Sequence, residues 1–461
     1  MEGGNRVTHV EQLALFVVNS SYDDISDSAC HELKIRVLDS LGCAIGALDE
    51  GPTRVIRKQI EDFGGSELCA LIGGGHTAPD RAALYNGSLV RYLDFNDSYL
   101  AKHETCHPSD NLGAVLAAAE YADRHGRDFL TALAVAYQVQ CRLSDVAPVR
   151  AKGFDHTTQG SFAVASGVSK ALALDQGRTA NAIAISGTAF NALRVTRTGA
   201  LSNWKGLAFP NAAFGATHAT FLAMRGITGP IEVFEGNKGF MQAISGQFEI
   251  DWSRENLELV KHTIIKKYNA EIHSQSAIDG ALELKHDHKF AAADIERIKI
   301  ETFDVAYNII GGGEEGDKTL VSTKEQADHS LQYMVAVAIL DDQVMPEQYR
   351  EERIRSGDVQ ELLRRIVVVP LDEFSTRFPH EMPSRITVSL RNGKMIVKEI
   401  SEYEGFYTHS MTWDTALRKF NKLTAAQRDT LLLDEIVQAV GSLDSIQVRE
   451  LTRLFERHKK E

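Results

Sequence analysis

Helical spacing dominates the first part of the chain. Apolar residues recur every three to four positions, as in helices that bury one face, through roughly the first 260 residues. Alanine and glycine are frequent in these segments, which suits closely packed helices, and strand-like alternation is scarce before residue 290. The predicted helices cover residues 9–18, 26–48, 53–63, 79–90, 111–125, 128–144, 158–172 and 177–190. A long all-helical region is therefore predicted.

The pattern changes near residue 295. Residues 295–303 alternate apolar and polar side chains, as a half-buried strand does. Residues 385–390 and 395–397 flank Asn392 and Gly393, a strong hairpin turn signal. Helical spacing marks residues 331–340 and 359–366 between these strands, and it returns after Ser410 over residues 413–423, 424–439 and 445–455.

These changes predict a mainly α fold with two domains. The larger domain is all-helical and discontinuous, with a first segment over residues 1–264 and a second over residues 401–461. Residues 265–400 form a smaller α+β domain. Since 461 residues exceed what one compact core usually holds, two domains are also expected from length. The boundary near residues 261–268 has no Pro/Gly linker, which indicates a tight hinge.

Composition excludes several classes of function. The formal net charge of −13 argues against nucleic acid as a partner. The five cysteines show no zinc-type spacing, and their odd number without a secretory signal indicates reduced thiols. No apolar run approaches the ~18 residues of a membrane span, and residues 1–12 lack a signal or transit pattern. We therefore expect a cytoplasmic protein without a membrane or nucleic-acid partner.

One stretch gathers unusual chemistry. Asp94, Asp97, Ser98 and His107 lie within 14 positions, and Pro108 then begins a predicted helix. Ionisable groups rarely crowd together in a core unless they face a site. His107 is predicted to lie at a helix N-terminus, where exposed backbone N–H groups attract anions. This stretch is the first candidate for an active site.

Further candidates occur later in the chain. His156 precedes a helix, Lys205 follows a basic run with Arg194 and Arg197, and Tyr333 lies on an apolar helix. Lys266, Lys267 and His273 lie at the domain junction. Each also has an ordinary structural explanation, since a single histidine is usually a cap or core group and lysines are usually solvated.

Phosphate-loop and metal motifs are weak by comparison. The triple glycines at 73–75 and 311–313 lack P-loop or dinucleotide spacing. His103 and His107 have a spacing of four, but HExxH is absent and the segment is not predicted as a helix. No metal and no cofactor are predicted. The residues alone indicate a two-domain helical enzyme with an anion pocket.

Five segments in order resemble the MmgE/PrpD family, over residues 10 to about 420. They are LDFNDS with CHPSDN, GFDHTTQG, NWKG, KKYNAEIHSQS and DHSLQYMVAVAIL. The family contains 2-methylcitrate dehydratases, cis-aconitate decarboxylases and iminodisuccinate epimerases. The resemblance implies a large helical domain built from both chain ends with a small α+β lid, a homodimer, and no iron–sulfur cluster.

The resemblance also implies roles for individual residues. The implied catalytic set is Asp94, His107, His156 and Tyr333. The implied substrate-binding set is Ser98, Lys205 and Lys266, with Lys267 as its competitor. The chemistry calls for further carboxylate clamps, for which Arg194 or Arg197 is expected, and His273 is a further candidate. The two histidines would move protons, with base and acid left open, and Asp94 would orient one of them. Lid closure would bring Tyr333 onto the histidines and exclude water.

The expected reaction is metal-independent dehydration of 2-methylcitrate, with citrate as a further substrate, in propionate breakdown through the methylcitrate cycle. A proton would leave the carbon beside a carboxylate, and an acid would assist loss of hydroxyl. The alternatives are a cis-aconitate decarboxylase or an iminodisuccinate-type epimerase of the same family. Glu271 stands where the decarboxylase type has histidine, Asn269 replaces a common proline, and the segment from Ser98 to His107 is longer. These departures argue against the decarboxylase.

Overall fold

The computed structural model describes residues 7–199 and 201–457 and divides the chain into two compact units. The helical unit comprises the chain up to Arg197, Trp204–Thr263 and the chain from Thr412 onward. The sheet unit comprises Thr198–Asn203 and Ile264–Met411. The sequence placed the two junctions at 264/265 and 400/401, and the contacts divide the chain at 263/264 and 411/412.

Amphipathic periodicity located most helices of the first segment within a few residues. They are α1 (His9–Asn19), α2 (Asp27–Gly46), α3 (Gly51–Phe63), α4 (Pro79–Tyr92), α5 (Leu112–Tyr121), α6 (Gly126–Val146), α7 (Thr157–Ala171), α8 (Gln176–Ala189) and α9 (Trp204–Met224). Helix α9 was not predicted. Its small and apolar residues show no single apolar stripe, and Pro210 lies inside it, so the local pattern carries no helical signal there.

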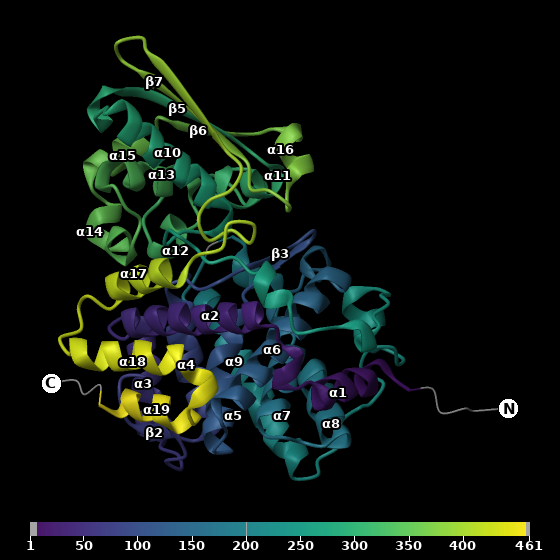
Figure 1. The fold of residues 1–461 in the computed structure, drawn as a ribbon. Coiled ribbons are helices and arrows are strands. Elements are labelled where there is room, and N and C mark those ends of the chain that lie inside the picture. Colours follow the sequence, from purple (N-terminus) through teal and green to yellow (C-terminus); the bar gives the residue numbers. More distant parts are fainter. Residues whose placement is uncertain (1–6, 200, 458–461) are drawn as a thin grey trace. The chain divides into compact units, whose positions relative to one another are not determined.

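The C-terminal helices share the core of the first segment. They are α17 (Trp413–Leu423), α18 (Thr430–Gly441) and α19 (Val448–Glu456), and they appear in yellow beside the purple α2 in Figure 1. Helices α17 and α18 pack on α2, and α19 packs on α5. A Cβ at Gly42 of α2 would lie 3.1 Å from the Phe420 side chain, so glycine allows the close approach of α17. The two ends of the chain therefore build one core.

The sheet unit has a mixed four-stranded sheet of order β6-β5-β7-β8. Strands β5 (Ile295–Thr302) and β6 (Ile366–Pro370) are parallel, while β7 (Ser384–Leu390) is antiparallel to both β5 and β8 (Met395–Ile400). Helices α10 (Gln275–His288) and α13 (Leu331–Asp341) pack against the sheet, and α15 (Gly357–Leu363) packs on α13 (Figure 1). The sheet and its helices enclose a second hydrophobic core.

The predicted mainly α fold with a small α+β part is confirmed, and so is the hairpin across Asn392 and Gly393. One element was assigned wrongly. The predicted helix over residues 359–366 ends at Leu363, and Ile366 begins the parallel strand β6. A short apolar run does not distinguish a buried strand from a buried helix by periodicity, and pairing with β5 decides it here.

The start of α6 offers a test of this shared core. A Cβ added at Gly126 would lie 1.6 Å from the carbonyl oxygen of Leu443, in the C-terminal segment. Gly126→Ala is therefore expected to lower the free energy of unfolding by about 1–3 kcal/mol or more, because backbone must move. Chemical denaturation measures this. Gly51→Ala is the control, since a Cβ at Gly51 meets nothing within 4 Å, and an equal loss in both variants would contradict the expectation.

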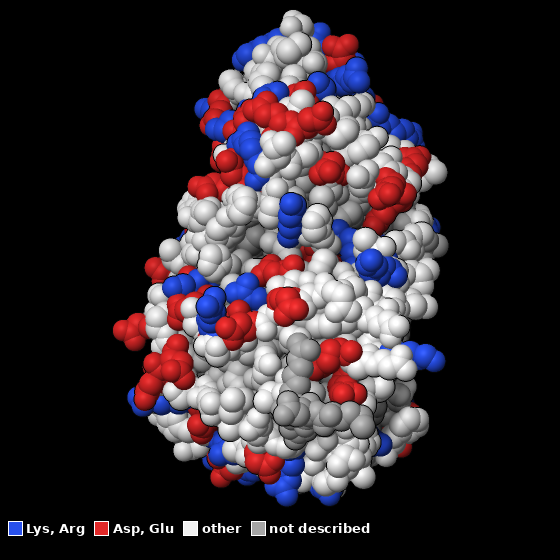
Figure 2. Space-filling view, turned by 90° about the vertical axis from the view of Figure 1, so that its right-hand side faces the viewer, with Lys and Arg blue, Asp and Glu red and all other residues white. Residues whose placement is uncertain are grey.

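Two surface properties bear on partners. Across the described ranges, every helix is too short or too polar to cross a membrane. On the face shown in Figure 2, Lys and Arg side chains are interspersed with Asp and Glu side chains, with no broad basic area among the residues drawn in colour.

Candidate functional site

A short hairpin brings Ser98 next to His107. Strands β3 (Tyr99–Ala101) and β4 (Glu104–Cys106) pair antiparallel with Tyr99 opposite Cys106, so the residues just outside the hairpin meet. The Ser98 Oγ lies 3.1 Å from the His107 Nδ1, and the Asp97 carbonyl oxygen lies 2.8 Å from the same nitrogen. Because a carbonyl only accepts, the proton is on Nδ1. In the neutral ring, Nε2 is then the nitrogen that can take a proton.

The Asp97 side chain links the hairpin to the turn that follows His107. Its buried carboxylate accepts from the Ser109 backbone N–H at 3.0 Å, from the Ser109 hydroxyl at 2.6 Å and from the Tyr137 hydroxyl at 2.8 Å. The expected helix N-terminus after His107 is present as a 3₁₀ turn leading into α5. The Ser109 N–H of this turn donates to the Asp97 carboxylate, so an internal anion occupies that amide.

Asp94 is paired with two cations. One oxygen lies 2.6 Å from the Arg91 guanidinium, and the other lies 3.1 Å from the Lys205 ammonium, with all three side chains almost fully buried. Asp94 also has a φ of 55°, in the left-handed region that non-glycine residues adopt at a cost of about 1 kcal/mol or more. Such strain persists where surrounding contacts enforce it. The carboxylate of Asp94 binds Arg91 and Lys205, and its expected role in orienting a histidine stays a prediction.

Arg91 also faces a second carboxylate. Its Nε lies 3.5 Å from Asp110, whose other oxygen accepts from the Asn96 side chain at 2.8 Å. Burial raises the pKa of Asp110 to about 7, although Arg91 and Asn96 act in the opposite direction. A carboxyl group that titrates near neutral pH therefore lies beside the Asp94 pair.

His156, at the start of α7, is held by a buried ion pair. The Arg197 Nη2 lies 3.0 Å from the His156 Nε2, and the Arg197 Nε donates to Asp155 at 2.8 Å. Burial lowers the pKa of His156 to about 3, against the opposing effect of Asp155. Burial alone would raise the pKa of Asp155, but the Arg197 guanidinium outweighs it and holds that pKa far below its usual range.

The two histidines meet. The His107 and His156 rings lie edge to face with centroids 5.2 Å apart, and the His156 ring stacks on Phe209 of α9 at 6.2 Å. The helical unit thus gathers two imidazoles beside the Asp155–Arg197 pair. Arg194, on the same 3₁₀ turn as Arg197, is half-buried and opposes a positive charge on His156.

The sheet unit holds its own buried charges. The His273 Nδ1 lies 2.8 Å from the Glu271 carboxylate, and the His273 ring contacts Phe303 and Phe378, each with centroids 5.6 Å away. Burial would raise the pKa of Glu271, but His273, His329 and Lys266 outweigh it and lower the pKa to about 2. Lys266 is buried, so this unit places a cation and a histidine around one carboxylate.

Two predicted residues of this unit are engaged elsewhere. Lys267 is half-exposed and pairs with Asp279 at 2.7 Å, which leaves Lys266 as the buried lysine of the junction. Tyr333 is fully buried in the core of the sheet unit, and its hydroxyl donates to the Gln348 carbonyl oxygen. That donation uses the only proton of the hydroxyl, and the expected approach of Tyr333 to the histidines on lid closure stays a prediction.

Several residues of the site were missed by sequence reasoning. Arg91 lies just outside a recognised motif, three residues before Asp94, and Asp155 lies inside the GFDHTTQG motif, one residue before His156. Asp97 and Asp110 were part of the first motif but received no role. A charged residue in or near a motif is a signal that the sequence offers. Its burial is a property of the tertiary structure, so the sequence could not show it.

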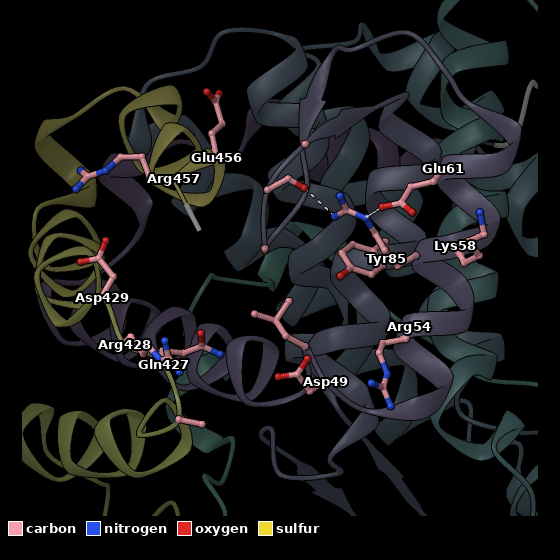
Figure 3. Close-up of a pocket in the computed structure, with 16 residues that line it drawn as sticks. Asp49, Arg54, Lys58, Glu61, Tyr85, Gln427, Arg428, Asp429, Glu456 and Arg457 are labelled. Carbon is pink, nitrogen blue, oxygen red and sulfur yellow. Dashed lines mark hydrogen bonds and ion pairs between the residues drawn. The ribbon is translucent and has the colours of Figure 1, made fainter. Parts of the chain in front are cut away.

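The helical unit also has a separate open groove of about 1350 Å³ (Figure 3). Its charged lining includes Arg54, Arg57, Lys58, Glu61, Asp429 and Glu456. Arg57 is already bound, to the Gly74 carbonyl at 2.7 Å and to Glu61 at 2.6 Å. The lining mixes both signs of charge and contains none of the predicted site residues.

Two family models match the chain. The MmgE/PrpD N-terminal domain matches residues 11–253, and the MmgE/PrpD C-terminal domain matches residues 268–439. The chain belongs to the MmgE/PrpD family. The recognised motifs and the helical architecture are thus those of a defined enzyme family, and the two matches lie on either side of the junction at 263/264.

Individual relatives of the chain are enzymes. A 2-methylcitrate dehydratase of Cupriavidus necator is 30% identical over 351 residues, covering 70% of each chain. A 2-methylcitrate dehydratase of Salmonella typhimurium is 27% identical over 415 residues, covering 84% of this chain and 83% of the relative. A cis-aconitate decarboxylase of Mus musculus is 25% identical over 478 residues, covering 97% and 93%.

Proposed function

We propose that this MmgE/PrpD protein is a hydro-lyase that removes water from 2-methylcitrate or a similar tricarboxylate. The observation that carries the proposal is the meeting of His107 and His156 beside buried cations, in a family whose relatives include 2-methylcitrate dehydratases. Removing a proton beside a carboxylate creates a strongly charged aci-carboxylate. Positioned proton acceptors and fixed positive charges are the groups that make this step possible.

In this proposal His107 takes the proton through Nε2, because Nδ1 is committed to the Asp97 carbonyl. The Ser98 hydroxyl, next to Nδ1, donates a hydrogen bond to a substrate oxygen, and the proton taken up by His107 is passed to the departing hydroxyl, which leaves as water. Lys205, paired with Asp94, supplies positive charge where the aci-carboxylate forms. Asp94 holds that ammonium in place rather than acting as a base.

Further carboxylates of the substrate need further cations. We assign this role to Arg194 and the buried Lys266, and we assign His273 a hydrogen bond to the substrate. Arg197 was expected to bind substrate, but its guanidinium is bound to Asp155 and His156. Lys267 and Tyr333 are left out of the proposed set because their polar atoms have partners within the sheet unit, in Asp279 and the Gln348 backbone.

Decarboxylation or epimerisation shares the same first step, a carbanion-like centre beside a carboxylate. The mouse cis-aconitate decarboxylase matches nearly the whole chain, so this alternative is included in the test.

The proposal also includes a homodimer, which light scattering tests through a mass of twice the chain.

The deciding experiment uses purified full-length protein treated with chelator. Alkene absorbance is followed while 2-methylcitrate, citrate and cis-aconitate are offered separately, and products are identified by chromatography. We expect absorbance to rise with 2-methylcitrate, and chelator to leave the rate unchanged. Release of carbon dioxide from cis-aconitate without dehydration of 2-methylcitrate would establish the decarboxylase instead. No reaction with any of the three would contradict the proposed substrate class.

A further inference from the structure

We propose that Asp155 and Arg197 are positioning residues that hold His156 as a neutral imidazole with its proton on Nδ1. His156 then serves as a hydrogen-bond donor to the substrate and does not gain or lose a proton. The inference deepens the proposed function. It rests on that function in one respect only, namely that the group accepting the His156 hydrogen bond is the substrate. The state of the ring itself follows from the geometry of the helical unit.

The first step concerns Nε2. A guanidinium carries only donors, so the 3.0 Å contact between the Arg197 Nη2 and the His156 Nε2 requires the ring nitrogen to accept. A ring nitrogen that accepts carries no proton. The neutral ring must therefore carry its single proton on Nδ1.

The second step explains why Arg197 stays in this position. Its Nε donates to one oxygen of Asp155 at 2.8 Å, and its Nη2 lies 3.5 Å from the other. Asp155 is fully buried, and its backbone N–H donates to the Ala192 carbonyl oxygen at 2.9 Å. The carboxylate thus fixes the guanidinium, and the guanidinium fixes the ring.

The third step concerns Nδ1. Within residues 7–199 and 201–457 this nitrogen is buried and has no hydrogen-bond partner. A buried donor without a partner costs about 1–3 kcal/mol, so such groups are usually paired unless they have another task. An oxygen atom of a bound substrate would satisfy it.

The charges around the ring oppose a second proton. Arg197, Arg194 and Arg91 all disfavour an imidazolium, while Asp155 favours it. The His107 ring packs against the same imidazole, and Phe209 covers one face. With three arginines against one carboxylate in a buried place, the neutral ring is the stable form.

This assignment divides the work between the two histidines. His107 has its proton on Nδ1 and offers Nε2 for proton transfer, whereas His156 offers an N–H that stays in place. A fixed neutral donor stabilises an oxygen that gains charge without a competing proton transfer. The question of which histidine moves the proton is thereby answered in favour of His107.

The test uses nuclear magnetic resonance of the full chain labelled with ¹⁵N-histidine, without substrate. Signals of His156 are identified by their loss in His156→Asn. We expect the neutral Nδ1–H form from about pH 5.5 to about pH 8.5, where an ordinary histidine titrates. Titration of His156 in that range, or a proton on Nε2, would overturn the proposal. The spectrum needs no activity, so it is separate from the fate of the proposed reaction.

A variant tests the role of the ion pair. Arg197→Met removes the donor and one positive charge, so His156 is expected to exchange between tautomers or titrate within that range. If the enzyme is active, kcat should fall about tenfold or more. Arg178→Met is the matched control, because Arg178 forms an exposed pair with Asp175 at 3.1 Å, and it should change neither readout.

If Arg197→Met does not fold because Asp155 is left as an unpaired buried charge, the double variant Asp155→Asn/Arg197→Met removes that charge. The same changes at His156 are expected in the double variant. An unchanged His156 spectrum in either folded variant would show that the ion pair does not set the tautomer, and it would overturn the assignment of Asp155 and Arg197.

Discussion

Replacing His107 with asparagine is expected to lower turnover of 2-methylcitrate by about 10²- to 10⁴-fold, the usual contribution of a general base. The asparagine amide can keep the donor bond that Nδ1 makes to the Asp97 carbonyl, so the loop should stay in place. What disappears is Nε2, the nitrogen assigned to proton transfer. Steady-state kinetics with 2-methylcitrate measures the loss.

His103→Asn is the matched control for that substitution. His103 is exposed on the turn of the same short hairpin, four residues before His107. Its replacement should leave kcat and KM unchanged. Thermal denaturation should show equal stability for both variants, and turnover of His107→Asn within about threefold of the unaltered protein would remove His107 from the chemistry.

Lys205→Met is expected to lower turnover by at least about 10²-fold, as the loss of one electrostatic contact in the transition state does. The side chain is 5% exposed, and its ammonium lies 3.1 Å from Asp94. Breaking a buried ion pair usually costs about 3–5 kcal/mol of unfolding free energy. Asp94 keeps Arg91 at 2.6 Å, so the stability loss should be smaller than that.

The two effects of Lys205→Met are separated by measurement. Denaturant titration gives the stability loss, and kinetics at a temperature where the variant is folded gives the catalytic loss. Lys58→Met is the control, since Lys58 forms an exposed pair with Asp62 at 2.7 Å on α3. A higher KM with unchanged kcat would mean that Lys205 binds substrate and transition state equally, against its assigned role.

Local sequence patterns were sufficient to predict an element where that element buries one face. The strong helical spacing of α2, α6 and α7, and the hairpin signal at Asn392 and Gly393, identify those elements because side-chain periodicity follows directly from backbone geometry. Helix α9 and strand β6 were not predicted, because α9 lacks a single apolar stripe and β6 depends on pairing with a strand that is distant in the sequence. Motif resemblance likewise located His107, His156 and Lys205, whose proposed roles are still to be tested.

The sequence by itself determined the family, the mainly α fold and the stretches of chain in which the candidate residues lie. Only the tertiary structure decided what those residues bind: Arg197 holds Asp155 and His156, Asp94 lies between Arg91 and Lys205, and Tyr333 bonds to its own unit. The reason is physical. A helix or turn is encoded within about a dozen neighbouring residues, whereas the charge and tautomer of a histidine depend on burial and on groups brought from far along the chain.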